Sequence, residues 1–203
     1  MGKFNLQKLQ SGDRFKIQKS MELDNIRVEL RFQGEDLDVQ AWLLNEDGLI
    51  VNDAAFVFYN SENRTEAWDK AKFGNKKRYL AETRPMSADG AVLGAKDEIE
   101  GGIETLNICL SKIAPEVNEV AISATVYQDG KTFGDVSFAK VLVIDEDSDE
   151  TLCEYELSND YSKETACVTA RFILNDDGEW EFVADGKAYD GGLQTLVELF
   201  TEE

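Results

Sequence analysis

The segment Ile26-Arg-Val-Glu-Leu-Arg-Phe-Gln33 decides the fold class of this 203-residue chain. Its apolar side chains alternate strictly with polar ones, which is typical of a β-strand with one buried and one exposed face. The same alternation returns at residues 120–127 and 168–174. More apolar runs at residues 39–44, 54–59 and 141–144 predict central strands, and residues 105–110, 152–157 and 179–183 complete the set.

Short turn sequences separate these predicted strands. Each ends in Gly after Asp or Asn side chains that stabilise turns, as in Asn45-Glu-Asp-Gly48, Gln128-Asp-Gly130, Asn175-Asp-Asp-Gly178 and Ala184-Asp-Gly186. Many short strands joined in this way predict an all-β protein, an antiparallel β-sandwich of about nine or ten strands. Apolar residues at helical spacing between Leu193 and Phe200 predict a short C-terminal helix.

Charge and composition exclude several classes of function. The chain has 41 acidic and 21 basic residues, a formal net charge of −20, and no histidine. This charge disfavours nucleic acid and anionic membranes as partners, because both require a basic face. The lack of histidine excludes Ser-His-Asp and Cys-His catalysis and histidine-ligated zinc. Any metal would be bound through oxygen or sulfur.

The cysteine pattern and the apolar runs indicate the compartment. Three cysteines, Cys109, Cys153 and Cys167, form no CxxC pair, so we expect buried free thiols in a reducing environment. No apolar run reaches the ~18–20 residues of a membrane span. Residues 1–6 lack the apolar core of a signal peptide. We therefore expect a cytoplasmic protein that folds as a single domain over residues 1–203.

Residues 63–84 form an insertion with a charge sign of its own. The stretch from Asn60 to Ser87 holds seven basic and four acidic residues, 7 − 4 = +3. Trp68 and Phe73 predict a short helix from about Thr65. Long loops of distinct composition often carry function. The alternative is a solvated insertion whose lysines pair with acidic neighbours.

Three acidic runs, at residues 35–38, 97–104 and 145–150, are candidate cation sites. Asp36 and Asp38 point the same way in an extended chain, so their carboxylates repel each other unless a cation or donors lie between them. The Gly-rich run 97–104 offers oxygens for a hard cation. None of the runs matches the EF-hand pattern, and each taken alone indicates a solvated turn. Carboxylate-based glycoside hydrolysis and nucleotide binding are not indicated.

The order of the motifs resembles one known family. The segments Asp36-Leu-Asp-Val-Gln-Ala-Trp-Leu-Leu-Asn-Glu-Asp-Gly48 and Asp53-Ala-Ala-Phe-Val-Phe-Tyr-Asn60 resemble the signature of the TerD-type tellurium-resistance and stress proteins. Further blocks follow in the same order: 87–90, 110–117, 133–137, 157–166, 178–182 and 186–193. The resemblance therefore covers nearly the whole chain.

The resemblance implies a β-sandwich that binds calcium through acidic loops and has no catalytic activity. The implied ligands are Asp36, Asp38, Asn60, Glu100 and Glu104, with Asp97 and Glu98 as nearby charge. One departure weakens this expectation. Where the family loop begins Gly-Asp-Asn, this chain has Gly94-Ala95-Lys96, which removes ligands and adds a positive charge. The calcium sites are therefore expected to be weakened or reduced to one.

Two functional hypotheses follow, and a third is kept for comparison. The first is a non-catalytic, calcium-binding stress-response protein that acts through other proteins of a stress-response system. The second is a metal-independent interaction module, in which Trp68, Phe73 and the run 76–78 dock a protein or a second copy of the chain. The third is an enzyme that uses carboxylates and a metal in a pocket around Asp36. The insertion either folds over the acidic edge or forms a partner surface.

Overall fold

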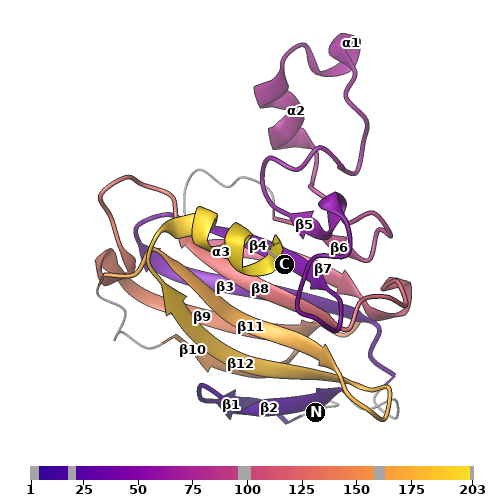
Figure 1. The fold of residues 1–203 in the computed structure, drawn as a ribbon, viewed down its shortest axis with the longest axis vertical. Helices are drawn as coiled ribbons and strands as arrows, with labels where there is room; N and C mark the ends of the chain where they lie inside the picture. The colour runs from indigo at the N-terminus through magenta and orange to yellow at the C-terminus, as the bar shows by residue number, and fades with distance from the viewer. Residues whose placement is uncertain (1–4, 18–21, 96–101, 158–162, 202–203) are drawn as a thin grey trace.

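Two β-sheets pack face to face in the computed structural model, which describes residues 5–17, 22–95, 102–157 and 163–201 (Figure 1). The first sheet contains, in spatial order, β1 (Gln7–Leu9), β10 (Glu150–Glu156), β9 (Val136–Asp145), β3 (Asn25–Gly34), β7 (Ile103–Cys109) and β6 (Val92–Leu93). The second contains β2 (Arg14–Ile17), β12 (Trp180–Tyr189), β11 (Ala166–Leu174), β8 (Glu119–Val126), β4 (Leu37–Leu44) and β5 (Phe56–Val57). Neighbouring strands are antiparallel, except that β1 runs parallel to β10.

The antiparallel sandwich and the C-terminal helix that the sequence predicts are confirmed. The helix is α3 (Gly192–Thr201), and the described residues form twelve strands rather than nine or ten. The strands that alternation did not predict are β1, β2 and β6, each of four residues or fewer. Residues 54–59, predicted as one strand, instead begin in a 3-10 turn, η2 (Asp53–Ala55), and contribute only β5.

The main core lies between the two sheets. Alternate residues of β3, such as Ile26, Val28 and Leu30, point inward and are buried, as the sequence pattern requires. Facing side chains from the second sheet include Phe172 and Phe182, whose rings meet edge to face at 5.3 Å. The 3-10 turns η3 (Leu110–Lys112) and η4 (Phe133–Asp135) lead into β8 and β9.

A smaller core lies on the outer face of the second sheet, beneath α3 (Figure 1). Its centre is Trp42, which is fully buried and stacks on Phe56 at 3.9 Å between ring centroids. Phe200 of α3 lies 4.9 Å from the same indole ring. The indole N–H donates to the Ser123 hydroxyl at 2.8 Å, so the one polar atom of the side chain is paired.

The chain crosses from the first sheet to the second through Glu35 and Asp36, immediately after Gly34. Gly34 has φ 116°, and a Cβ there would lie 2.6 Å from the carbonyl oxygen of Asp135. Only glycine fits this close approach of two backbones. The crossing therefore fixes the acidic run 35–38 at one end of the sandwich.

The insertion leaves the sandwich between β5 and β6 and projects away from both sheets (Figure 1). It holds two short helices, α1 (Lys70–Phe73) and α2 (Lys76–Glu82). The first helix begins at Lys70 rather than near Thr65, because the Asp69 side chain caps it by accepting from the Ala71 N–H. Within the described residues, no helix combines the length and apolar character that a membrane crossing requires.

Candidate functional site

The structure places two of the predicted calcium ligands, Asp38 and Glu104, on opposite-facing sides of different sheets. Asp38 is opposite Thr125 in the β4–β8 pair and shares the outer face of its sheet with Trp42. Glu104 is opposite Leu30 in the other sheet and is 7% exposed, on the core-facing side with Leu106. Strand alternation therefore turns Asp38 and Glu104 away from each other.

The other predicted ligands do not complete a site among the described residues. Asp97, Glu98 and Glu100 lie outside the described residues. Asn60 lies in the turn after β5, where it lines a pocket of the insertion. In the described parts of the chain, no three carboxylate or thiolate side chains are grouped so as to hold a metal ion. The described side chains alone do not fit calcium, which takes six to eight oxygens.

Lys131 pairs with acidic residues at this end of the sandwich. Its ammonium lies 2.7 Å from a carboxylate oxygen of Glu35 and 3.4 Å from one of Asp135. The hydrogen bond to Glu35 is the main reason that the pKa of Lys131 is raised. One alternative from the sequence has lysines of the insertion fold over this edge, but the ion pairs of the insertion, Lys72–Glu66 and Arg78–Glu82, are internal.

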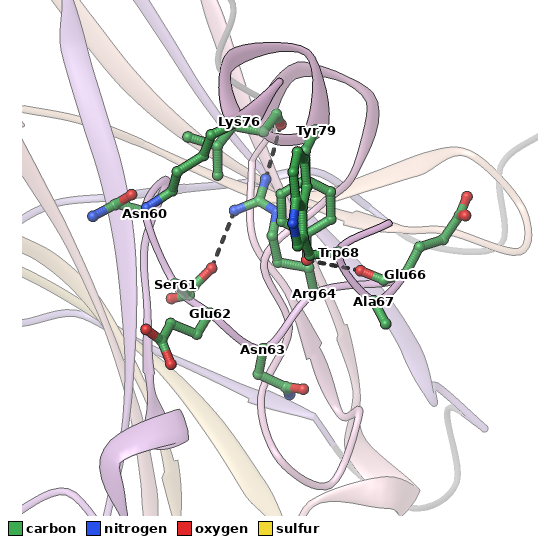
Figure 2. Close-up of a pocket in the computed structure, with 11 residues that line it drawn as sticks. Asn60, Ser61, Glu62, Asn63, Arg64, Glu66, Ala67, Trp68, Lys76 and Tyr79 are labelled. Atoms are coloured by element: carbon green, nitrogen blue, oxygen red, sulfur yellow. Dashed lines mark hydrogen bonds between the residues drawn. The ribbon is translucent and has the colours of Figure 1, made fainter. Parts of the chain in front are cut away.

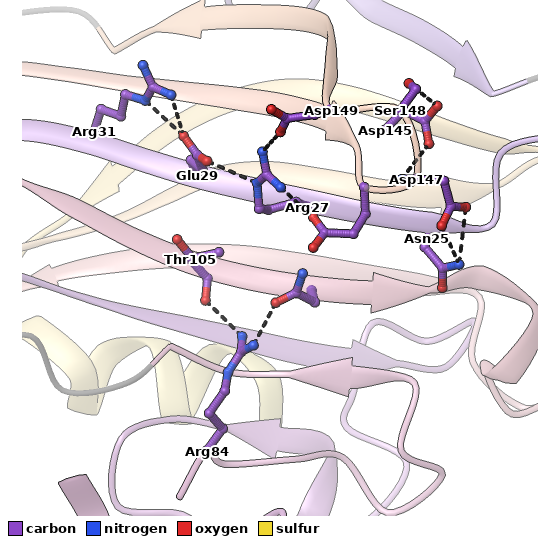
Figure 3. A network of polar contacts seen from close by, with 12 residues as sticks. Asn25, Arg27, Glu29, Arg31, Arg84, Thr105, Asp145, Asp147, Ser148 and Asp149 are labelled. Carbon is purple, nitrogen blue, oxygen red and sulfur yellow. Dashed lines mark hydrogen bonds and ion pairs between the residues drawn. The ribbon is translucent and has the colours of Figure 1, made fainter. Parts of the chain in front are cut away.

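The acidic run 145–150 spans the turn between β9 and β10, and two of its carboxylates pair with an arginine (Figure 3). Arg27 of β3 pairs with Glu146 at 2.7 Å and also with Asp149 and Glu29. The hydrogen bond to Asp149 contributes most to the raised pKa of Arg27. The sequence indicates a solvated turn here, and the structure shows that two carboxylates of this turn are held by Arg27.

Arg64 anchors the first residues of the insertion. Its side chain is buried, and its five N–H groups reach neutral oxygens only. The acceptors are the carbonyls of Tyr59, Ser61, Leu80 and Thr83 and the Thr83 hydroxyl, at 2.6 to 3.4 Å. Burial lowers the pKa of Arg64. The guanidinium thus ties the turn after β5 to the end of α2.

Arg84 anchors the last residues of the insertion in the same manner (Figure 3). Its guanidinium donates to the carbonyls of Leu93, Gly94 and Thr105 and to the Asn107 side chain, at 2.7 to 3.1 Å. The Thr65 N–H donates to the Arg84 carbonyl at 2.9 Å, which joins the two ends of the insertion. The insertion is therefore fixed to the sandwich at its base.

A pocket of about 690 Å³ opens at this base (Figure 2). Its lining combines aromatic, amide and charged side chains: Asn60, Ser61, Glu62, Asn63, Arg64, Glu66, Ala67, Trp68, Lys76, Tyr79 and Leu80. Trp68 is 48% exposed, whereas the rings it contacts, Phe73 and Tyr79, are 1% and 7% exposed. The pocket lies at the insertion, and Asp36 is not among its lining residues.

Sequence reasoning identified the insertion and Trp68 but missed the pocket. It counted Arg64 and Arg84 only toward the net positive charge of the insertion, whereas both guanidinium groups bind backbone carbonyls. A signal was available in their positions, because they flank the insertion while the other five basic residues lie between them. A count of charges treats all seven basic residues alike, and it is their position in the fold that separates the two at the base from the other five.

Comparison with known proteins identifies a family along most of the chain. The family model described as TerD domain matches residues 6–200. The tellurium resistance protein TerD of Serratia marcescens is 30% identical over 175 residues, covering 83% of this chain and 79% of that protein. General stress protein 16U of Bacillus subtilis is 28% identical over 169 residues, covering 80% and 75%.

A solved structure shares the fold. The crystal structure of a homologue of telluride resistance protein (TerD) from Streptomyces coelicolor A3(2) superposes with a TM-score of 0.60. It is 20% identical and covers 89% of this chain and 96% of that one. At this identity the likeness concerns the arrangement of the two sheets.

Proposed function

The chain belongs to the TerD domain family of tellurium-resistance and stress proteins, and on that basis we propose that it acts in a stress response by binding a partner protein. We propose no catalytic activity. The absence of histidine from the whole sequence supports this view, since it removes the commonest general acid and base. The relatives named for resistance and stress are consistent with a binding role.

The observation that carries the proposal is the half-exposed Trp68 on an anchored, projecting insertion. Tryptophan is enriched at the energetic centres of protein interfaces, because it buries a large apolar area at low entropic cost. The rings of Phe73 and Tyr79 support it from behind, at 6.2 and 5.4 Å between centroids. Because Arg64 and Arg84 hold the base, the indole is presented in a fixed position.

Complementation tests this proposal. Host cells that lack the gene would carry wild-type protein, Trp68→Ala or a matched exposed-aromatic control, Tyr127→Ala, where Tyr127 is 65% exposed on the sandwich. We expect loss of tellurite or oxidative-stress survival for Trp68→Ala alone, with all proteins at equal abundance and equal melting temperature. Full protection by Trp68→Ala would contradict the proposed role of the insertion.

We propose calcium binding at the acidic end of the sandwich as a second, separable property. The Phe32 N–H donates to the Gly102 carbonyl at 3.0 Å, so Gly102, which belongs to the Gly-rich acidic run, lies at the end of β3, beside the crossing that holds Asp36. The family resemblance supplies the proposed ligands, Asp36 with acidic residues of the run 97–104. Ala95 and Lys96 stand where the family loop has Asp and Asn, which removes oxygen ligands and adds a positive charge, so we propose a single weak calcium site.

Calorimetric titration with calcium chloride, with magnesium chloride as the comparison, tests this second property. Binding to the folded state raises the melting temperature by mass action. We expect Asp36→Asn to abolish both effects and Asp176→Asn, an equal charge change in the β11–β12 turn, to preserve them. No heat and no gain in melting temperature at millimolar calcium would reject the metal site. Deleting residues 65–83 is expected to leave calcium affinity unchanged.

A further inference from the structure

We propose that the pocket at the base of the insertion binds an acidic peptide segment of the partner, in which carboxylates flank one leucine-sized or aromatic side chain. The inference rests on the proposed function, since it assigns chemistry to the partner that the insertion binds. The proposed ligand is a carboxylate-bearing segment of another protein.

The first argument is the uncompensated charge of Arg64. Its hydrogen-bond acceptors are all neutral, and none of the ion pairs among the described residues involves it. The guanidinium also lies over the Tyr79 ring, 5.7 Å from its centroid. These dipoles and the ring stabilise the charge but do not cancel it, and little water screens the field that remains. Arg64 therefore contributes a positive potential at the inner end of the pocket, which favours an anionic group there.

The second argument is the placement of the surrounding charges. Lys76 lines the pocket, is exposed and has no ion-pair partner among the described residues. Of the two acidic lining residues, Glu66 is paired with Lys72 outside the pocket. Figure 2 shows the carboxylates of Glu62 and Glu66 on either side, directed away from the Arg64 guanidinium. Lys76 is therefore the lining cation that can contact an incoming carboxylate directly, whereas Arg64, whose N–H groups are all donated to internal acceptors, acts on it through its electrostatic field.

The third argument is the apolar wall. Trp68 and Tyr79 lie side by side in Figure 2, with their ring centroids 5.4 Å apart. Leu80 and Ala67 extend this wall. The volume of about 690 Å³ lies within the range of pockets that bury small ligands or a few residues of a peptide. An apolar ligand side chain packed against the indole would lose its contact with water.

A short acidic segment fits this site better than a nucleic acid does. The chain as a whole has a net charge of −20, so a long polyanion that extends beyond the pocket would meet repulsion from the sandwich. A compact segment with a few carboxylates meets mainly the local field of Arg64 and Lys76. The charge pattern of the molecule therefore selects a short anionic ligand.

Fluorescence anisotropy with fluorescein-labelled octapeptides tests the inference. The probe peptides have one leucine or phenylalanine with two Asp or Glu residues on each side, and their Asn and Gln versions are the neutral controls. We expect at least tenfold tighter binding of the acidic peptides. Trp68→Ala and Lys76→Glu should each weaken binding at least tenfold. Lys70→Glu, an equal charge change in the insertion outside the pocket, should weaken it less than threefold.

Three results would overturn the inference: no preference for the acidic peptides, equal loss for Lys76→Glu and Lys70→Glu, or displacement of the peptide by unlabelled Lys76→Glu protein. The last result would identify a second copy of the chain as the occupant. Failure here is distinguishable from failure of the proposed function. If Trp68→Ala abolishes stress protection but no acidic peptide binds, only the assigned chemistry is wrong. If acidic peptides bind but Trp68→Ala cells survive stress, the proposed function fails.

Discussion

Replacing Arg64 with methionine should release the insertion while leaving the sandwich folded. The substitution keeps an unbranched apolar stem and removes all five hydrogen bonds of the guanidinium. Three of these bonds, to the Ser61 carbonyl, the Thr83 carbonyl and the Thr83 hydroxyl, are buried. Each buried acceptor left unpaired costs at least about 1 kcal/mol, so local opening should become easier by about 3–4 kcal/mol.

Amide hydrogen exchange measures this effect directly. A change of about 3–4 kcal/mol corresponds to exchange roughly 10²–10³-fold faster at protected amides of the insertion, such as those of Thr65 and Thr83. Amides of β3 and β8 should exchange at the wild-type rate, because the sheets do not depend on Arg64. Limited trypsin digestion should cut the variant within residues 70–78.

The matched control is Arg78→Met, an identical chemical change in the same insertion. Arg78 forms one exposed pair with Glu82, four residues away, and such pairs contribute about 0.3–0.5 kcal/mol. Exchange should therefore change by about twofold or less. If Arg64→Met left the exchange of Thr65 and Thr83 within a factor of about three of wild type, the proposed anchoring role of Arg64 would be wrong.

Three further predictions concern the sandwich. Trp42→Ala should lower the free energy of unfolding by about 3–5 kcal/mol in a urea titration, because the indole is fully buried and stacked; a loss below about 1 kcal/mol would contradict this packing. A thiol reagent at neutral pH should label only Cys109 in the native protein and all three cysteines in denaturant. Cys153 and Cys167 are buried, and burial raises the pKa of Cys153 to about 12, so these thiols are neither accessible nor ionised. Rapid labelling of a second thiol in the native protein would refute this prediction. Hydrogen bonds from Asn175 and then Arg14 lower the pKa of Glu181 below its ordinary 4.5, so this carboxylate stabilises the fold above about pH 4.5 and the contribution is lost as pH falls further. The stability difference between wild type and Glu181→Gln should therefore shrink below about pH 4.5, and a difference independent of pH would count against it.

The sequence predicts most of the sandwich because burial alone selects the inward face of each strand. In β3 the apolar residues recur at every second position, and the structure buries those positions. β8 alternates in the same way but is buried on both faces, because its outer face contributes Ala121 to the smaller core. The same reasoning fails for β6 and β5, which are two residues long. Pairing with a neighbouring strand defines such short strands, and no local pattern records which strand lies beside them.

Strand alternation also determines whether the predicted calcium ligands Asp38 and Glu104 can lie close together. Asp38 is four residues from Trp42 and therefore on the same face, and Trp42 lies in the outer core. Glu104 is two residues from Leu106, which lies in the inner core. Asp38 and Glu104 could then share a site only around the end of the sandwich. The sequence alone does not show which of the two cores a given strand face contacts, because both cores are apolar.

The position of the insertion explains how the sandwich accommodates it. It begins after β5, the edge strand of one sheet, and ends before β6, the edge strand of the other. Exposed strand edges promote unwanted pairing, and proteins protect them by keeping them short or covered. Arg84 covers one such edge by binding the carbonyls of Leu93 and Gly94 at β6. The base of the insertion thus protects the exposed edge at β6. The residues beyond this base belong to neither core, so they can suit a partner without disturbing the packing of the sandwich.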